Sequence, residues 1–332
     1  MRFRFLAIAL GFFLLMPLTF LANSRSYILY HQTKCRITQD ILDSNFKAAL
    51  LRFDSMHHDY SFIFSNDCIM ALQTALVAND STRSVMWLTK CFTQGVPEWI
   101  LQTNGITRIV FESTFYNSVL QSKDSLRTIY ANKLNYGVRR KMEKMFRRDQ
   151  WITHHLNDAH VVSLPFYYIL WLRNNRIEKH QIMKICKRYS FPGEQLIGIM
   201  RYYEDSTISA SQIRSIGPGI TNNMAMIMLL HFYTTQRKSE NKVLFKALEN
   251  GYLTPYQYGS IQDFMSKWKH NPYGRFYYYN VWHNDPDSTS NSAIDQRRLA
   301  IGLPSLALKE KLDQLNRANR KNKKLNNVIL LN

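Results

Sequence analysis

Three residues in this sequence could carry acid–base chemistry if the fold brings them together: His231, Asp149 and Asp263. An imidazole changes charge near neutral pH, so a histidine oriented by a carboxylate is suited to act as a general base. We expect His231 as the base, Asp149 as the residue that orients it, and Asp263 as a candidate third member. Structural interpretations stay open as well: His231 could be a core histidine that holds a backbone carbonyl, and Asp149 could pair with a neighbouring arginine.

Other polar clusters in the chain follow no established metal or nucleotide pattern. His154 and Asp158 are one helical turn apart, as two metal ligands can be, but no further ligand follows at a recognised spacing. The stretch NDPDSTSNS, residues 284–292, lacks the glycine and the terminal glutamate of a calcium loop. We therefore predict no metal ion and no cofactor. The chain also lacks a serine-nucleophile motif, which argues against the common hydrolase classes.

Helices must position these side chains, because apolar residues recur at helical spacing along most of the chain. Met224, Ile227, Met228 and His231 stand at i, i+3, i+4 and i+7, which places His231 on an inward stripe. Glycine is scarce, with 12 residues in 332, and the second half shows no useful strand-like alternation. The sequence therefore predicts an all-α fold. The run FYYILWL, residues 166–172, is apolar all round and is predicted to lie centrally.

A Pro-Gly pair in YSFPGEQLIG, residues 189–198, has the composition of either a phosphate loop or a corner between helices. A phosphate loop needs several glycines that turn their N–H groups toward one anion, and here an acidic residue follows a single glycine. The stretch therefore predicts a corner. Gly193 turns the chain, and Glu194 begins the next helix, where its charge suits the helix dipole.

The first residues predict an exported chain. Arg2 and Arg4 precede an apolar run over residues 5–22, and the small residues Ala22 and Ser24 stand two apart at its end. This pattern is typical of a signal peptide over residues 1–24, and it implies a periplasmic or secreted protein. An uncleaved membrane anchor is the alternative, because the run is just long enough to span a bilayer. Export permits disulfides, so Cys68 and Cys91 could pair, although we favour small buried hydrophobic side chains at both positions.

Positive charge dominates the composition, with a formal net charge of +19. Two basic stretches, residues 139–148 and 309–324, could meet anionic lipid head groups or acidic glycans, or could simply be solvated helix faces. Residues 309–332 are expected to form a basic C-terminal helical tail. Leu308, Leu312 and Leu315 lie on one side of it, and the apolar end NNVILLN suggests an anionic membrane surface as a partner. An exported chain is not expected to bind nucleic acid.

The N-terminal region, residues 25–131, is predicted to consist of helix pairs. Its segment DCIMALQTALVANDSTRSVMWLTKCFTQGV, together with helices starting near Ser44 and Ser81, resembles degenerate tetratricopeptide-like helical repeats with a period of ~34 residues. The resemblance implies stacked helix pairs that present one face to a protein partner. An ordinary helical bundle without a binding groove is the alternative.

Residues 132–308 are expected to form a second all-α domain, an α-helical bundle. Ordered elements within residues 135–308 are Asp149-Gln150, KRYSFPGEQLIG, His231, ALENGYLTPYQYGSIQD, Tyr273-Gly274 and IDQRRLAIGLPSL. In this order they resemble a bacterial domain-of-unknown-function family (numbered six-six-two-four). The resemblance implies a site that contains His231 and Asp149, with further candidate binding residues at Gln150, Tyr273, Arg297 and Arg298.

This chain departs from the family's pattern at three polar positions. WITHH, after Asp149-Gln150, lacks the family's arginine, Tyr233 stands where the family tends to have aspartate, and Arg275-Phe276 replaces Thr-Gln. The family itself has no assigned reaction. The sequence thus favours a non-enzymatic, exported protein that binds a protein partner or associates with the envelope. The alternative is a hydrolase that acts on an envelope glycan or peptide through His231 and Asp149.

Overall fold

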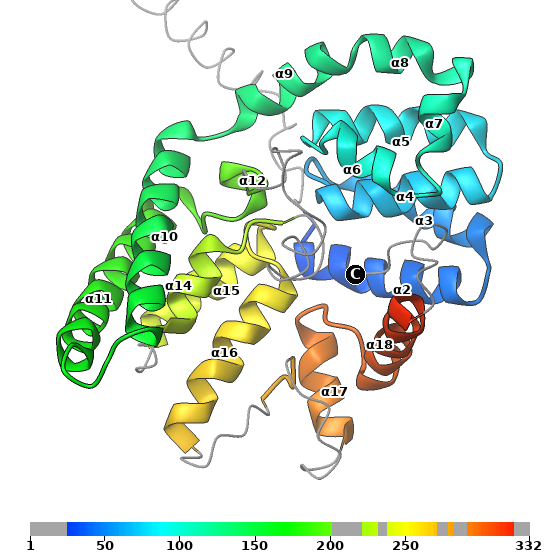
Figure 1. The fold of residues 1–332 in the computed structure, drawn as a ribbon. Helices are drawn as coiled ribbons and strands as arrows, with labels where there is room; N and C mark the ends of the chain where they lie inside the picture. The colour runs from blue at the N-terminus through cyan, green and yellow to red at the C-terminus, as the bar shows by residue number, and fades with distance from the viewer. Residues whose placement is uncertain (1–24, 201–220, 232–237, 271–277, 282–290, 322–332) are drawn as a thin grey trace, which may run out of the picture.

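All regular structure in the described part of the chain is helical, which confirms the predicted all-α fold (Figure 1). The computed structural model describes residues 25–200, 221–231, 238–270, 278–281 and 291–321. The leader over residues 1–24, Tyr273-Gly274, NDPDSTSNS up to residue 290 and the terminal NNVILLN lie outside these ranges. Within them, no helix is long and apolar enough to cross a bilayer.

The N-terminal region folds into antiparallel helix pairs. α2 packs against α3, and α4 packs against α5. The Asp80 side chain accepts a hydrogen bond from Arg83 N and caps α5, and Gly95 ends that helix with a φ of +80°. The elements here are α2 (Tyr27–Leu42), α3 (Phe46–Asp59), α4 (Ser65–Val77), α5 (Ser81–Thr93), α6 (Glu98–Thr103), α7 (Ile109–Glu112), η2 (Thr114–Tyr116), α8 (Asn117–Gln121) and α9 (Lys123–Lys133).

The second half is built on a long antiparallel hairpin, α10–α11, which packs against α14 (Figure 1). α16 packs against both α14 and α15, and its N-terminus has a capping box between Thr254 and Gln257. The elements are α10 (Tyr136–Asn157), α11 (Leu164–Tyr189), α12 (Glu194–Ile197), α14 (Met224–His231), α15 (Lys238–Glu249), α16 (Pro255–His270), α17 (Asn291–Ala300) and α18 (Leu306–Lys321).

One hydrophobic cluster runs through both halves. It includes Trp87 and Phe92 from α5 as well as Ile182 from α11 and Met228 from α14. The predicted boundary between residues 131 and 132 falls within the last turn of α9, and the core is continuous across it. Cys68 and Cys91 are free thiols in this core, so the interpretation as small buried side chains is confirmed.

YSFPGEQLIG forms the predicted corner. α11 ends at Tyr189, and α12 begins at Glu194. Gly193 lies against the backbone of the segment after α15: a Cβ added to it would be 2.2 Å from the carbonyl oxygen of Tyr252. A backbone atom cannot swing aside as a side chain can, so only glycine allows this approach.

We expect Gly193→Ala to lower the free energy of unfolding by about 2 kcal/mol, because the methyl group forces the corner and the Tyr252 segment apart. Urea unfolding monitored by circular dichroism measures the change. Gly137→Ala is the matched control, since the nearest atom to its new Cβ is the flexible Asn135 Oδ1 at 3.5 Å. Alanine favours a helix, so this control should be neutral or slightly stabilising. Equal stability of Gly193→Ala and the wild type would contradict the packing argument.

The prediction that residues 166–172 lie centrally is wrong for most of that run. Trp171 is buried, but Phe166 and Ile169 are each 66% exposed. Their neighbours Tyr168 and Leu172 are exposed too. The end of the hairpin extends beyond the helices that could cover it (Figure 1), so an apolar composition did not lead to burial.

The tail helix α18 turns its apolar stripe inward. Leu312 and Leu315 pack against the core, and Leu308 lines a cavity. In Figure 1, α18 lies beside α2, so the two ends of the described chain meet. The part of the predicted tail in α18 is therefore a structural element of the fold.

Candidate functional site

The structure brings His231 and Asp149 together although 82 residues separate them in the sequence. His231 is the last residue of α14, and its Nδ1 lies 2.8 Å from Oδ1 of Asp149 in the middle of α10. Asp149 is fully buried, whereas the His231 side chain is 20% exposed. The Gln150 side chain donates to Asp149 Oδ2 at 2.8 Å, and Asn175 of α11 donates to the His231 carbonyl at 3.0 Å.

A second buried carboxyl group, Glu178 of α11, lies beside this pair. Burial, and then the negative charge of Asp149, raise the pKa of Glu178 to about 8. Glu178 is therefore mostly protonated at neutral pH, which leaves the negative charge on Asp149. Asp149 can then hold the Nδ1–H of His231 and leave Nε2 as the basic nitrogen. This geometry fits an oriented general base, and it equally fits a polar cluster that joins α10, α11 and α14.

We expect Glu178→Gln to stabilise the protein by about 3 kcal/mol at pH 9 and to have little effect at pH 4, below the ordinary pKa of a glutamate. The pKa of Glu178 is about 8 in the folded protein and 4.5 in its ordinary state. The wild type therefore loses stability as the pH rises from 4.5 to 8. Glutamine keeps the shape without the charge. Urea unfolding at both pH values tests this, with exposed Glu112→Gln as control. An unchanged pH dependence in Glu178→Gln would show that Glu178 ionises freely.

Asp263 has a different environment from the His231–Asp149 pair. Its two carboxylate oxygens accept hydrogen bonds from Tyr279 N at 2.7 Å and Val281 N at 2.8 Å. Burial raises the pKa of Asp263 to about 6. These contacts fasten residues 279–281 to α16, and this explains a buried aspartate without any catalytic role.

The two candidate arginines hold the same segment from its other side. Arg298 is buried, and it donates from Nε to Pro304 O and from Nη1 to Tyr279 O and Asn280 O. Arg297 donates to Tyr278 O, and its guanidinium lies over the Tyr278 ring at 4.8 Å. Candidate residue Tyr273 lies outside the described residues. His154 and Asp158 form an exposed pair at 3.3 Å.

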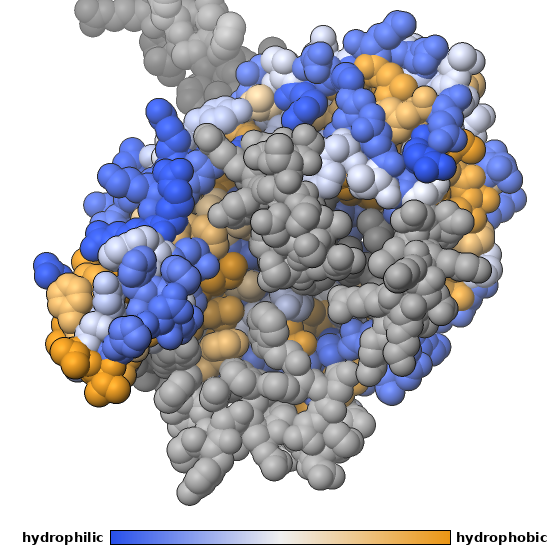
Figure 2. Space-filling model, in the orientation of Figure 1, coloured by the Kyte–Doolittle hydropathy of each residue, from blue (hydrophilic) through white to orange (hydrophobic). Residues whose placement is uncertain are grey.

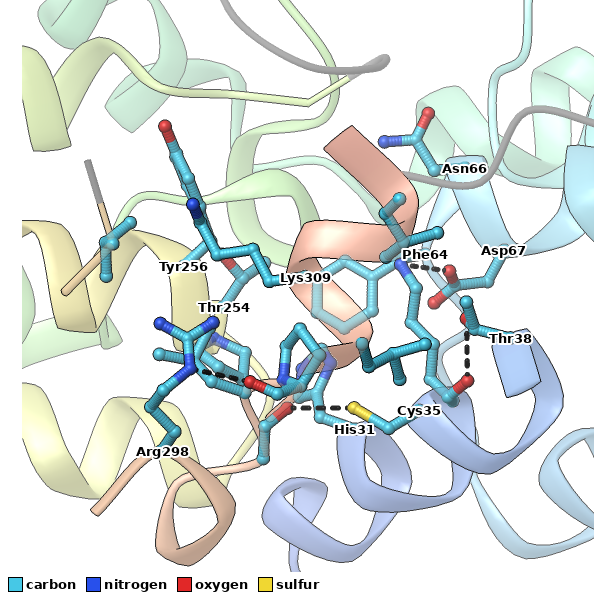
Figure 3. A pocket seen from close by; sticks show the side chains of 18 of the residues that line it. His31, Cys35, Thr38, Phe64, Asn66, Asp67, Thr254, Tyr256, Arg298 and Lys309 are labelled. Atoms are coloured by element: carbon cyan, nitrogen blue, oxygen red, sulfur yellow. Dashed lines mark hydrogen bonds and ion pairs between the residues drawn. The ribbon is translucent and has the colours of Figure 1, made fainter. Parts of the chain in front are cut away.

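A cavity of about 270 Å³ lies where the N-terminal helices meet the C-terminal ones (Figure 3). α2, the start of α4, α12, the start of α16, the turn after α17, and α18 all contribute to its lining. The polar and charged residues that line it are His31, Lys34, Cys35, Thr38, Asn66, Asp67, Glu194, Thr221, Asn223, Thr254, Tyr256, Arg298, Lys309 and Asp313. Its apolar wall includes Phe64, Val281, Leu303, Leu308 and Leu312.

One carboxylate of the cavity is already paired. Asp67 is fully buried, accepts a hydrogen bond from Tyr30 Oη at 2.7 Å, and lies 2.6 Å from Lys34 Nζ. Figure 3 shows Asp67 at the edge of the pocket with the ion pair drawn as a dashed line. The pair is neutral overall, so it gives the cavity polarity but little net charge.

The other carboxylate, Glu194, is only half satisfied. Its Oε1 accepts from both Ser65 N and Ser65 Oγ at 2.7 Å, and its Oε2 accepts no hydrogen bond from any described residue. Glu194 is 4% exposed. Burial is the main cause that raises the pKa of Glu194 to about 7, and the Ser65 bonds oppose this rise. Glu194 does begin α12, as predicted, but its side chain is buried. Its interaction with the helix dipole therefore does not describe its whole environment.

His31 adds a second unsatisfied polar atom to the cavity wall. The residue is 6% exposed, and its Nε2 has no hydrogen-bond partner among the described residues. Burial lowers the pKa of His31 well below its ordinary value, so the ring is neutral at neutral pH. Buried polar atoms without partners are uncommon in folded proteins and call for an explanation.

The sequence analysis did not predict this cavity. Asp67 and Glu194 are separated by a long stretch of chain, and each sits in an ordinary helix start. The one available signal was Glu194 after Pro-Gly, where a corner buries the residue that follows it. Among the described residues, no cluster of histidine, cysteine or acidic side chains has the arrangement of a metal site.

Comparison with protein-family models, with curated proteins and with solved structures found no match. The resemblances to tetratricopeptide-like repeats and to the family of unknown function therefore remain predictions.

Proposed function

We propose that this chain is an exported, envelope-associated protein that acts by binding, and that its ligand occupies the cavity between α2, α12, α16 and α18. One observation carries the proposal: the cavity contains a buried carboxyl group, Glu194, whose Oε2 has no partner among the described residues. A ligand that donates a hydrogen bond there would compensate for the cost of burying Glu194. The volume is at the lower end for small-molecule sites, so the ligand is small.

The charges around the cavity favour a zwitterion. Glu194 is suited to an ammonium group, because a charge-assisted hydrogen bond is stronger than a neutral one. Arg298 also lines the cavity; it donates from Nε and Nη1 to carbonyls, and its Nη2 donates to no described residue. Since no carboxylate among the described residues forms an ion pair with Arg298, a ligand carboxylate would balance its charge. Lys34 is already neutralised by Asp67.

The remaining lining favours an apolar body. Phe64, Val281, Leu303, Leu308 and Leu312 form a wall that removes an aliphatic or aromatic group from water. The ligand class is therefore a small molecule with an ammonium group, a carboxylate and an apolar side chain, as in an apolar amino acid. Export follows from the predicted leader. The helix pairs also predict a protein partner. In this proposal, that partner binds the protein when the cavity holds its ligand.

Calorimetry with three molecules that share one phenyl body tests the ligand class. Phenylalanine has both charges, phenethylamine only the positive one, and 3-phenylpropionate only the negative one. We expect phenylalanine to bind at least tenfold more tightly than either of the others. Tightest binding of 3-phenylpropionate, or no binding of any of the three, would contradict the proposal.

The hydrolase remains a second candidate function, because the 2.8 Å contact between His231 Nδ1 and Asp149 Oδ1 is the contact that an oriented base requires. In this role, His231 Nε2 would take a proton from water that attacks a glycan or peptide bond of the envelope. Asp149 would stabilise the imidazolium that forms. The His231 side chain keeps 20% of its surface accessible, so the ring is not sealed in the core.

A further inference from the structure

The tip of the α10–α11 hairpin exposes a concentration of large apolar side chains. Val161 is 88% exposed, Val162 94%, and Phe166 and Ile169 66% each. Figure 2 shows this apolar surface at the lower left, where Figure 1 places the end of the hairpin. We call these four residues, together with Trp151, Leu164, Tyr168 and Leu172, the hairpin tip. Contiguous apolar surface of this kind usually marks an interaction site.

The apolar side chains cover more than half of the helix circumference rather than one narrow stripe. At 3.6 residues per turn, Leu164, Tyr168, Leu172, Ile169 and Phe166 cover an arc of ~200°. A helix that docks on another protein typically presents a narrower stripe, with polar residues on the remaining face. A convex tip that is apolar on several sides fits a fluid apolar medium better than one flat or grooved partner.

Positive charge lies behind the tip. Residues 136–189 contain 12 Lys and Arg against four Asp and Glu. Two of the four acidic residues, Asp149 and Glu178, are buried, so they add little to the surface. Arg147 and Arg148 on α10, and Arg173 and Arg176 on α11, are exposed. The hairpin surface behind the apolar tip is therefore strongly cationic.

The spacing between tip and arginines matches the layers of a bilayer. Arg147 is ten residues before the end of α10, and Arg173 is nine residues after the start of α11. At 1.5 Å per residue they lie ~13–15 Å behind the turn. An interfacial segment buries its apolar side chains ~5–10 Å deep, so long arginine side chains can reach lipid phosphates. Trp151 and Tyr168 lie between, as aromatic side chains do at membrane interfaces.

We propose that the hairpin tip inserts into the interface of an anionic lipid bilayer, with Arg147, Arg148, Arg173 and Arg176 bound to the phosphates. This deepens the envelope association in the proposed function, and it does not depend on the cavity ligand. It also moves the membrane contact away from the C-terminal tail, whose apolar stripe in α18 packs inward. The tip and the cavity are formed by different helices, so one can fail while the other is correct.

Flotation of the exported, full-chain protein with vesicles tests the inference. We compare phosphatidylcholine vesicles with vesicles that also contain phosphatidylglycerol. The wild type should bind the anionic vesicles at least tenfold more strongly than the neutral ones. The double variant Phe166→Ser/Ile169→Ser should lose at least tenfold of the anionic binding. The control Leu29→Ser/Leu51→Ser removes two similarly exposed side chains elsewhere and should bind as the wild type does.

A second measurement separates the tip from any contribution of the N-terminal apolar segment. Brominated lipids quench tryptophan fluorescence only at short range, so Trp151→Phe should remove a large part of the quenching. Arg173→Gln/Arg176→Gln should weaken binding to anionic vesicles alone and reduce its dependence on salt. Unchanged vesicle binding by Phe166→Ser/Ile169→Ser, together with unchanged quenching in Trp151→Phe, would overturn the inference. Phenylalanine binding in solution should be the same in all of these variants.

Discussion

Glu194→Gln is expected to weaken phenylalanine binding by about 100-fold at pH 8. Glutamine has the shape of glutamate, and its carbonyl can still accept the two bonds from Ser65. It cannot offer a negative charge to the ligand's ammonium group. Loss of a buried, charge-assisted contact costs about 2–5 kcal/mol in affinity, which contains the 100-fold change. Isothermal calorimetry measures it, with exposed Glu112→Gln as control.

The same variant should remove the pH dependence of binding. Since burial raises the pKa of Glu194 to about 7 in the empty cavity, the wild-type affinity should rise through pH 7 and become level above about pH 8. Below pH 6 the ligand must displace a proton, so the affinity should fall. The charged or titratable groups on the elements around Glu194 are His31, Lys34, Cys35, Asp67, Tyr256, Arg298, Lys309 and Asp313. A pH dependence that survives in Glu194→Gln would assign it to one of these groups.

His31 and Cys35 are not expected to produce that step. Burial lowers the pKa of His31 far below neutrality, and burial raises the pKa of the Cys35 thiol to about 11. Both groups therefore stay neutral between pH 6 and 8. The step in affinity near pH 7 should belong to Glu194 and should vanish with its carboxyl group.

If the protein is a hydrolase, His231→Ala should reduce the hydrolysis of isolated peptidoglycan at least 100-fold. An oriented general base contributes about 10²–10⁴-fold to a rate, and alanine removes the basic nitrogen entirely. Release of reducing ends or of free amino groups distinguishes glycan from peptide cleavage. His180→Ala, on the exposed face of α11, is the matched control and should retain the wild-type rate.

Two results would contradict the catalytic role. The first is a purified wild-type protein without measurable hydrolysis, and the second is a His231→Ala variant as active as the wild type. Either result leaves the contact between His231 and Asp149 as a structural one between α14 and α10. Phenylalanine binding should not change in His231→Ala, because His231 does not line the cavity. The two candidate functions therefore have separate variants and separate measurements.

Local patterns predicted the helices and one long-range contact correctly. Helical spacing placed His231 on an inward face, and the order of short elements linked it to Asp149. The cap at Asp80, the capping box at Thr254 and the corner at Gly193 follow from backbone chemistry within a few residues. Such features depend on neighbours in sequence, so they can be read before the tertiary structure is known.

The cavity and the hairpin tip could not be read in this way. The sequence predicts that Glu194 begins a helix, where its charge interacts favourably with the helix dipole. Only the fold places it beside Ser65 and near Asp67. The apolar composition of residues 166–172 predicts a core position that the structure does not show, because composition cannot tell whether another element will cover a segment. Asp263 was grouped with His231 as a candidate catalytic carboxylate, yet both its oxygens hold backbone N–H groups of residues 279–281.

A crystal structure of the protein with phenylalanine, at a saturating concentration and pH 8, is the most direct measurement of the central proposal. We predict density for the amino acid inside the cavity, with its ammonium group within hydrogen-bond distance of Glu194 Oε2. Its carboxylate should face Arg298, and its ring should contact Phe64 or Leu308. A cavity that holds only water under these conditions, or a ligand bound elsewhere on the molecule, would contradict the account.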